Sequence, residues 1–260
     1  MNGGAALVTG GARRLGRAMV LYLAGRGHDV AIHYSRSAAE AGAVATEARA
    51  LGVRAVTLCA DLLDEDATAA LVGQAAAGLE RPLTVLVNNA STFDYDNIRS
   101  ASKQSWDRNI GTNLRAPFVL TQGFAAQAPK ALHGAAGACA QALVINMLDQ
   151  RVRKLTPEFI SYTIAKMGLW AFTQTAARAL APDIRVNAIG PGSTLKGTHQ
   201  SPAQFDAQRA ASILARGANP ADITAALGYF LDASAVTGQL LCVDGGQHLG
   251  WKTPDILGSN

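Results

Sequence analysis

The sequence predicts a single α/β domain, with a doubly wound, seven-stranded parallel sheet covered by helices on both faces. Short apolar runs alternate with longer, Ala-rich helical segments along the 260 residues, and such alternation builds right-handed βαβ units. The strand runs are apolar throughout, as a parallel sheet covered on both faces requires. The chain shows no internal repeat, low-complexity linker or shift in composition, and its length suits one large domain. We therefore expect one domain over residues 1–260.

The seven expected strands are short runs rich in Val, Ile, Leu and Ala. In chain order they are Ala5–Thr9, Asp29–Tyr34, Val53–Leu58, Leu83–Val87, Ala142–Asn146, Ile184–Ala188 and Gln239–Val243. The helices between them are Ala-rich, and glycines end the first two. They are a helix ending near Gly27, then Ala38–Leu51, Asp66–Leu79, a long region around Trp106–Gln127, Ile160–Leu180 and two short segments before the last strand. We expect residues 193–216 to form a substrate loop over the site, and residues 248–260 to form a polar tail.

Composition excludes several classes of protein. Hydrophobic residues make up 49% of the chain and charged residues 16%, which excludes intrinsic disorder. The net charge of +4 is too small and too dispersed for a nucleic-acid surface. No apolar run reaches the ~18–20 residues that cross a bilayer, and the first residues lack the pattern of a signal peptide. We expect a cytoplasmic protein with a small-molecule substrate and neither a nucleic-acid nor a membrane partner.

The cysteines and histidines predict no metal site. Cys59, Cys139 and Cys242 are an odd number without CxxC spacing, so neither a disulfide framework nor a zinc site is expected. The five histidines lack the paired spacing of metal ligands.

A Gly-rich turn follows the first strand. Residues 9–16 (TGGARRLG) leave that strand and open a helix. Glycine there lets the backbone approach a pyrophosphate, and the helix N-terminus offers free N–H groups and a positive dipole end. Glycine also marks ordinary turns, but this place in a βαβ pattern predicts a dinucleotide site.

The end of the second strand indicates which dinucleotide binds. A site that prefers NAD has an acidic residue there, which accepts from the ribose 2′-hydroxyl. This strand instead ends in residues 33–37 (HYSRS), with no acid until Glu40. Arg36 can hold a 2′-phosphate as a fork, and Ser35 or Ser37 can donate to it. The alternative is that Arg36 is a solvated loop charge. We expect NADP(H).

A second group of residues predicts proton-transfer chemistry. Tyr162 and Lys166 are four residues apart on an expected helix, so the ammonium can lie beside the phenol and lower its pKa. Asp149, thirteen residues upstream of the tyrosine, closes the fifth strand at the edge where open α/β sheets bind ligands. Asn113 is a polar residue among helical apolar residues, and the alternative is a satisfied amide inside a helix.

These motifs together resemble the short-chain dehydrogenase/reductase family over essentially the whole chain. They are the turn at Thr9–Gly16, Asp61, Asn88-Asn89-Ala90, Asn113, Tyr162 with Lys166, Arg185-Val186-Asn187, Pro191-Gly192 and Val243-Asp244-Gly245-Gly246. The resemblance implies a Rossmann fold, an Asn–Ser–Tyr–Lys tetrad, NADP(H) or NAD(H), and a homotetramer.

Two departures from the family pattern narrow the resemblance. Arg14 stands where the family usually has glycine, and Asp149 stands where it usually has the catalytic serine. Both are similar to the pteridine reductase branch and to a related branch that reduces dihydromonapterin. That resemblance implies that Arg14 contacts pyrophosphate and pterin, that Phe93 sandwiches the pterin against the nicotinamide, and that Asp149, Tyr162 and Lys166 handle the proton. It also gives Ser91, beside Phe93, to the substrate site.

The exchange of serine for aspartate has a chemical reason. A serine hydroxyl donates to a ketone oxygen, which a carboxylate cannot do unless it is protonated. Pterins carry ring N–H and amino groups from which a carboxylate can accept, and reduction of a C=N bond needs a proton at nitrogen. The alternatives are that Asp149 only caps a turn and that Phe93 is a core residue.

The sequence therefore predicts an NADPH-dependent short-chain reductase of a pterin, with Tyr162 as proton donor. Its predicted cofactor residues are Thr9, Gly10, Arg13, Arg14, Leu15, Gly16, His33, Tyr34, Ser35, Arg36, Ser37, Asp61, Leu62, Asn89, Ala90, Tyr162, Lys166, Pro191 and Gly192. The predicted catalytic residues are Tyr162, Lys166, Asp149 and Asn113, and the substrate residues are Arg14, Ser91, Phe93, Asp149 and Tyr162. One alternative is a carbonyl or 3-oxoacyl-type reductase, and another is an NADP-sensing protein without catalysis.

Overall fold

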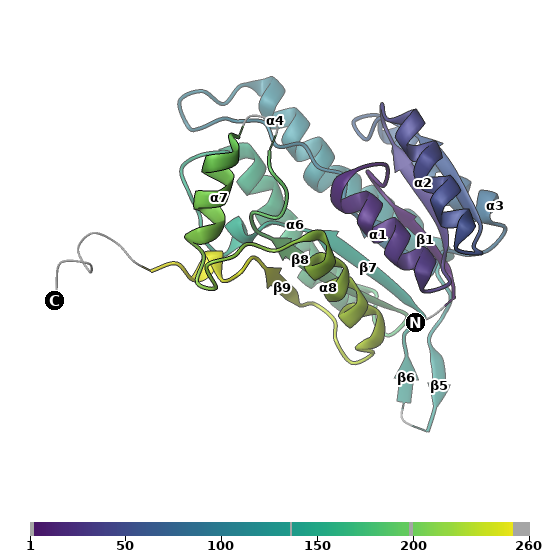
Figure 1. The fold of residues 1–260 in the computed structure, drawn as a ribbon. Coiled ribbons are helices and arrows are strands. Elements are labelled where there is room, and N and C mark those ends of the chain that lie inside the picture. The colour runs from purple at the N-terminus through teal and green to yellow at the C-terminus, as the bar shows by residue number, and fades with distance from the viewer. Residues whose placement is uncertain (1–2, 136, 198–199, 252–260) are drawn as a thin grey trace.

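The computed structural model describes residues 3–135, 137–197 and 200–251. Seven parallel strands form one sheet in the order β3-β2-β1-β4-β7-β8-β9, which confirms the predicted doubly wound fold (Figure 1). The strands are β1 (Ala5–Val8), β2 (Asp29–Tyr34), β3 (Ala55–Cys59), β4 (Val85–Asn88), β7 (Ala142–Met147), β8 (Ile184–Pro191) and β9 (Leu240–Val243). Burial extends along the whole of β1, β4 and β7 and along most of β2 and β8. A parallel strand covered on both faces needs apolar side chains on both sides, which explains the apolar runs in the sequence.

Helices cover both faces of this sheet. The core on one face is built with α1 (Arg14–Gly25), α2 (Ala38–Ala50) and α8 (Pro220–Asp232). The core on the other face is built with α3 (Glu65–Leu79), α5 (Ala116–Gln127) and α6 (Ile160–Ala179). Phe230 anchors the first core and Phe124 the second, each at most 1% exposed.

The long helical region expected around Trp106–Gln127 is divided. It comprises α4 (Lys103–Ile110), a π-helical turn η1 (Gly111–Arg115) and α5. α4 begins earlier than expected because Ser102 and Ser105 form a capping box at its N-terminus. The π-helical turn contains Asn113, and such turns recur at functional sites.

A hairpin, β5 (Leu132–Gly134) with β6 (Gly137–Cys139), occupies the Gly/Ala-rich stretch where no strands were expected. It projects beyond the end of the sheet at which the chain starts (Figure 1). Its residues are exposed, so it has no buried apolar face that would have predicted strands.

The expected substrate loop contains a helix, α7 (Pro202–Ala210). α7 lies toward the opposite end of the molecule from the hairpin (Figure 1). Arg209 in α7 donates to the backbone oxygens of Ser193, Gly217 and Ala218, which holds the two ends of the segment together. Residues 198–199 of this loop and residues 252–260 of the expected tail lie outside the described residues.

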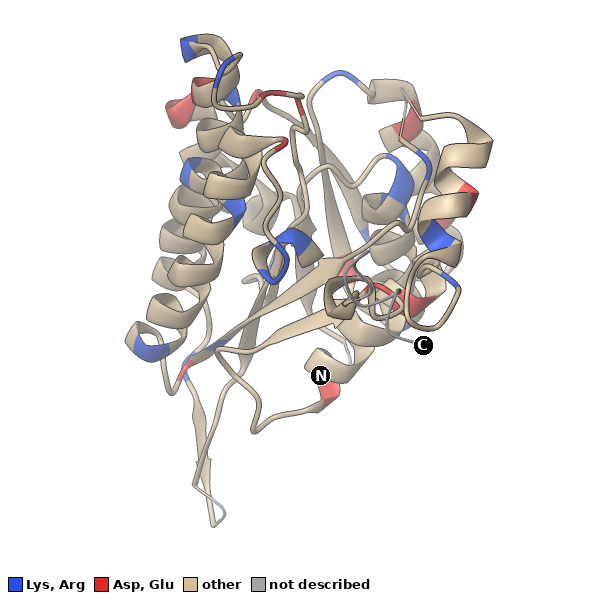
Figure 2. Ribbon diagram, turned by 90° about the vertical axis from the view of Figure 1, so that its left-hand side faces the viewer, with Lys and Arg blue, Asp and Glu red and all other residues tan. Residues whose placement is uncertain are grey.

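Charged residues of both signs are spread over the helices (Figure 2). Within the described part of the chain, no helix is both long enough and apolar enough to span a membrane.

Candidate active site

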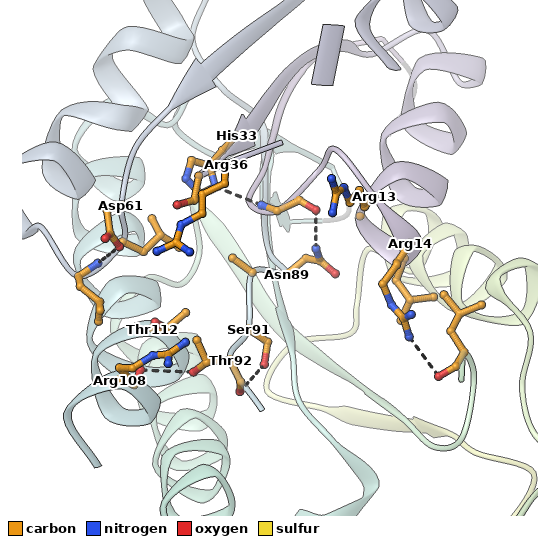
Figure 3. Close-up of a pocket in the computed structure, with 18 of the residues that line it drawn as sticks. Arg13, Arg14, His33, Arg36, Asp61, Asn89, Ser91, Thr92, Arg108 and Thr112 are labelled. Atoms are coloured by element: carbon orange, nitrogen blue, oxygen red, sulfur yellow. Dashed lines mark hydrogen bonds between the residues drawn. The ribbon is translucent and has the colours of Figure 1, made fainter. Parts of the chain in front are cut away.

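A cavity of about 830 Å³ opens at the carboxyl ends of the strands. It lies where the strand order reverses between β1 and β4, the place where doubly wound sheets bind ligands. It is lined by Gly10, Arg13, Arg14, Leu15, Gly16, His33, Ser35, Arg36, Asp61, Leu62, Leu63, Asn89, Ala90, Ser91, Thr92, Gln104, Arg108, Thr112, Gly192, Thr194 and Leu195. Figure 3 shows arginines on both sides of Asn89, with Arg36 toward β2 and Arg14 toward the substrate loop.

Most of the predicted cofactor residues line this cavity, and six do not. The six are Thr9, Tyr34, Ser37, Tyr162, Lys166 and Pro191. Thr9 is buried, and its hydroxyl oxygen accepts from the backbone N–H groups of Asn89 and Ala90 (2.9 and 3.0 Å). Tyr34 packs against the core on the α1 side. Thr9 therefore joins β1 to the loop after β4 from behind the cavity wall.

The backbone of the Gly-rich turn closes tightly. Gly10 has φ of +62°, which favours glycine. A Cβ on Gly16 would lie 2.1 Å from the Gly10 carbonyl oxygen, so no larger residue fits unless the turn moves. Asn89 Nδ2 donates to the Thr9 and Gly10 oxygens at 2.8 and 3.2 Å, which fixes the turn against β4.

His33 supports the same turn from β2. Its Nδ1 accepts from the Gly10 N–H at 3.1 Å, so the proton is on Nε2, which donates to the Ala60 oxygen at 3.1 Å. Burial lowers the pKa of His33 and keeps the ring neutral. His33 thus shapes the cavity through the backbone of Gly10.

Arg14 has a left-handed backbone with φ of +51°. This geometry explains why glycine suits the position, since a side chain there strains the backbone. The Arg14 guanidinium donates to the backbone oxygens of Leu195 (3.1 Å) and Lys196 (3.0 Å). Arg14 therefore links the first turn to the substrate loop (Figure 3).

Two further arginines, Arg13 and Arg36, line the cavity. Arg13 pairs with Glu40, the first acid after β2. Arg36 and Ser35 are exposed, and no carboxylate of the described residues pairs with Arg36. A guanidinium and a hydroxyl can thus face an anionic group at this end.

Tyr162, Lys166 and Asp149 meet one another outside the lining of the cavity. The Tyr162 hydroxyl donates to Asp149 Oδ2 at 3.0 Å. Lys166 lies one helical turn further along α6, with Nζ 5.6 Å from the centroid of the Tyr162 ring and donating to the Met147 oxygen at 2.8 Å. The i, i+4 spacing and the end of β7 therefore place these three groups together.

Burial and the aspartate set the protonation states of this group. Burial raises the pKa of Asp149. Burial, followed by the negative charge of Asp149, raises the pKa of Tyr162 well above its usual value. Lys166 is 2% exposed, and burial lowers its pKa to about 8. Lys166 was expected to lower the pKa of Tyr162, but desolvation and the Asp149 carboxylate raise it instead. Tyr162 thus holds its proton at neutral pH.

Asn113 is buried in the π-helical turn, and both its amide nitrogen and its amide oxygen are hydrogen-bonded. Its Nδ2 donates to the Thr92 oxygen at 3.0 Å, and its Oδ1 accepts from the Ser91 hydroxyl at 2.6 Å. The Ser91 side chain also lies near enough to Tyr162 to lower its pKa. Ser91 therefore connects the cavity wall to both Asn113 and the tyrosine.

Phe93 lies at the outer side of the site. It is 51% exposed, which excludes the alternative of a core residue. The Phe159 ring stacks on it with centroids 4.1 Å apart and an interplanar angle of 7°, and the Tyr162 ring meets it edge-on at 4.7 Å. The remaining exposed surface of Phe93 can take a flat ligand.

Several residues around this site were not predicted from the sequence. Arg108 in α4 and Thr112 in η1 both line the cavity, and both lie within the helical region expected around Trp106–Gln127, but neither was predicted as a site residue. Phe159 has φ of +55° just before α6, and Arg151 lies beside the aromatic pair. The only available signal was the spacing of Arg108 and Thr112 from Asn113, because the other two lie in irregular segments without a pattern.

A family model described as short chain dehydrogenase matches residues 4–206. The chain belongs to the short-chain dehydrogenase family. The structure is similar to FolM alternative dihydrofolate reductase 1 from Brucella canis complexed with NADP, at 41% identity, 97% coverage of each chain and a TM-score of 0.90. The structure is also similar to that of a short chain dehydrogenase from Burkholderia cenocepacia in complex with NADP. The two chains are 31% identical, the match covers 95% of this chain and 98% of that chain, and the TM-score is 0.84.

This short-chain dehydrogenase also has similar relatives by sequence. It is 37% identical to an uncharacterized oxidoreductase of Mycobacterium tuberculosis, in a match that covers 96% of this chain and 95% of the relative. It is 32% identical to the 3-oxoacyl-[acyl-carrier-protein] reductase of Staphylococcus aureus, in a match that covers 94% of this chain and 98% of the relative. Relatives with different named activities therefore match nearly the whole chain.

Proposed function

We propose that this protein is an NADPH-dependent reductase whose substrate is a pterin of the dihydropterin or dihydromonapterin type. The observation that carries the proposal is the Asp149 carboxylate, which accepts from Tyr162 at the place where a ketone-reducing site needs a hydroxyl donor. The likeness to an alternative dihydrofolate reductase at 41% identity supports the same substrate class.

The cavity fits NADP(H). At Gly10 and Gly16 a Cβ would meet the turn itself or the loop after β4, so glycine lets the turn close tightly at the start of α1, where the helix N-terminus would hold a pyrophosphate. Arg36 and Ser35 would hold the 2′-phosphate, and Asp61 lies beyond them in the cavity wall. When bound, NADPH supplies the hydride.

Tyr162 would donate the proton that the reduced C=N bond requires. Its raised pKa keeps the phenol protonated at neutral pH, which favours reduction over oxidation. Asp149 would accept from the ring N–H or amino group of the substrate, and thereby orient it toward the phenol. Lys166 would stabilise the phenolate once the proton has left.

Two other groups would complete the substrate site. Phe93 would stack on the flat pterin, and Phe159 would support it from behind. Ser91, which lines the cavity, would contact the substrate. Arg14 would contact both the pyrophosphate and the pterin. Asn113 would keep Ser91 and Thr92 in place through its hydrogen bonds.

The test is a substrate panel with NADPH, run on the wild type, Tyr162→Phe and Tyr95→Phe. We expect a dihydropterin to be reduced faster than small ketones and a 3-oxoacyl thioester. Tyr162→Phe should lose at least about 100-fold in kcat, since it removes the proton donor. Tyr95→Phe is the control, because Tyr95 is 59% exposed and lies outside the Asp149–Tyr162 pair, called the reacting pair below.

Two alternatives predict other outcomes of the same panel. A carbonyl or 3-oxoacyl-type reductase, which the Staphylococcus aureus relative favours, would reduce the ketone or thioester and leave the dihydropterin unchanged. An NADP-sensing protein would bind NADPH but turn over no substrate, and Tyr162→Phe would change nothing. Either outcome would contradict the pterin assignment.

We further propose a cytoplasmic homotetramer. Ile164 and Met167 on α6 are 42% and 38% exposed, and apolar residues on an outer helix favour contact with another subunit. The three cysteines are free thiols, as a reducing compartment favours. Light scattering of the purified protein would give the number of subunits.

A further inference from the structure

Arg151 lies in the short turn η2 (Gln150–Val152), directly after the aspartate of the reacting pair. Its backbone N–H donates to Asp149 Oδ1 at 2.8 Å. Tyr162 donates to the other carboxylate oxygen. The Asp149 side chain is therefore held between the start of η2 and the tyrosine of α6.

The side chain of Arg151 is also fixed. Nη1 donates to the Thr156 hydroxyl at 2.6 Å. The guanidinium carbon is 5.0 Å from the centroid of Phe159 and 5.8 Å from that of Phe93. These two rings stack 4.1 Å apart, so the guanidinium makes cation–π contacts with both members of the stack. Its charge thus has a defined place at the edge of the site.

No carboxylate among the described residues lies within ion-pair distance of the Arg151 guanidinium. Phe93, which the guanidinium contacts, meets the Tyr162 ring edge-on at 4.7 Å, so the positive charge lies one ring away from the Asp149–Tyr162 pair. There it lowers the pKa of Asp149 and that of Tyr162 against the effect of burial. Lys166, the other cation there, has a pKa of only about 8, whereas a guanidinium stays charged at every relevant pH.

We propose that Arg151 is a positioning residue that supplies a permanent positive charge to the Asp149–Tyr162 pair and keeps the carboxylate ionised to accept hydrogen bonds from the substrate. This rests on the proposed function only for the roles of those two residues. A neutral aspartic acid would offer a donor where the N–H group of the substrate needs an acceptor.

Asp149 faces four titratable or charged groups. Arg151 reaches it from η2, Tyr162 and Lys166 from α6, and Cys242 from β9. Burial, followed by nearby Asp244, raises the pKa of Cys242 to about 11, so this thiol stays neutral below that pH. Arg151 is the one group of the four whose removal takes away a fixed charge without altering a proton carrier.

The test follows the titration of the Asp149 carboxyl carbon by NMR in the ligand-free protein, with Asp149→Asn to assign the signal. Arg151→Met should raise the midpoint by about one pH unit, a tenfold gain in proton affinity, and Arg151→Gln should do the same while keeping a polar group near Thr156. Arg151→Lys should stay close to the wild type. Arg153→Met is the matched control, because Arg153 lies over Trp170 instead, 5.6 Å from its centroid.

An unchanged midpoint in a folded Arg151→Met or Arg151→Gln protein overturns the proposal, since a purely packing role would leave the titration alone. The same variants should move the acidic limb of the kcat/KM profile for a dihydropterin upward by the same amount. Because the NMR titration needs no substrate, a shifted midpoint without pterin turnover would refute the proposed function and leave the role of Arg151 standing.

Discussion

At Arg14 a residue with a long side chain occupies a left-handed backbone, with φ of +51°. The sequence showed that an arginine stands where the family usually has glycine. It could not show that the Arg14 backbone is strained, or which atoms the Arg14 side chain hydrogen-bonds. The guanidinium spans from the first turn to the Leu195 and Lys196 oxygens, a contact between residues about 180 apart in sequence. Such a contact depends on the path of a loop that has no periodic pattern.

Comparing Arg14→Gly with Arg14→Ala isolates this strain. Both variants lose the guanidinium, and only alanine keeps a Cβ in the left-handed region. We expect the glycine variant to be more stable by about 1 kcal/mol in the free energy of unfolding, measured by urea denaturation without cofactor. Equal stabilities, or a more stable alanine variant, would show that the backbone at this position is not strained.

At the scale of elements, the N-terminus of α6 is capped from a distant loop. Phe159 precedes the helix without a side-chain cap of its own. Asp96, 1% exposed, accepts from the Ser161 N–H at 3.2 Å, from the Ser161 hydroxyl and from the Ser105 hydroxyl at 2.9 Å. The Asp96 backbone oxygen accepts from the Phe159 N–H at 2.7 Å. The helix that carries Tyr162 was predicted from its own sequence, but this cap was not, because capping patterns are read only within a few residues.

Asp96→Asn should therefore loosen the start of α6. The amide places a donor among hydroxyl and N–H donors and removes negative charge from a helix N-terminus, at a cost of about 1–3 kcal/mol. Urea denaturation checks the stability, and amide exchange checks the first turn of α6. Asp94→Asn is the control, because the Asp94 side chain is 38% exposed and, among the described residues, its one ion pair is a long one with Arg108 at 3.4 Å. A loss no larger than that of the control would mean that Asp96 does not hold the helix.

At the scale of the whole molecule, the parallel sheet explains how much of the site was predictable. Every strand of the main sheet runs in one direction, so motifs that end different strands must meet at one edge. Gly10, Asn89 and Asp149 could be brought together on that argument alone. The hairpin of β5 and β6, the π-helical turn around Asn113 and the stack of Phe93 on Phe159 could not, since each depends on local packing without an apolar period.

In this architecture the site has two parts. One is the cavity that fits a dinucleotide, and the other is the Asp149–Tyr162 pair, which does not line that cavity. The cavity predicts little about the substrate, because its features suit any NADP(H)-dependent member of the family. In the proposed function, the carboxylate at position 149 distinguishes a site for N–H donors from a site for carbonyl oxygens.

The most direct test is therefore the ratio of kcat/KM for a dihydropterin to kcat/KM for a small ketone, measured in the wild type and in Asp149→Ser. Serine restores a hydroxyl donor and removes the acceptor. We predict that the ratio falls at least about 100-fold in Asp149→Ser, through loss of pterin reduction and gain of ketone reduction. A ratio that stays the same, with pterin turnover intact, would contradict the role given to Asp149.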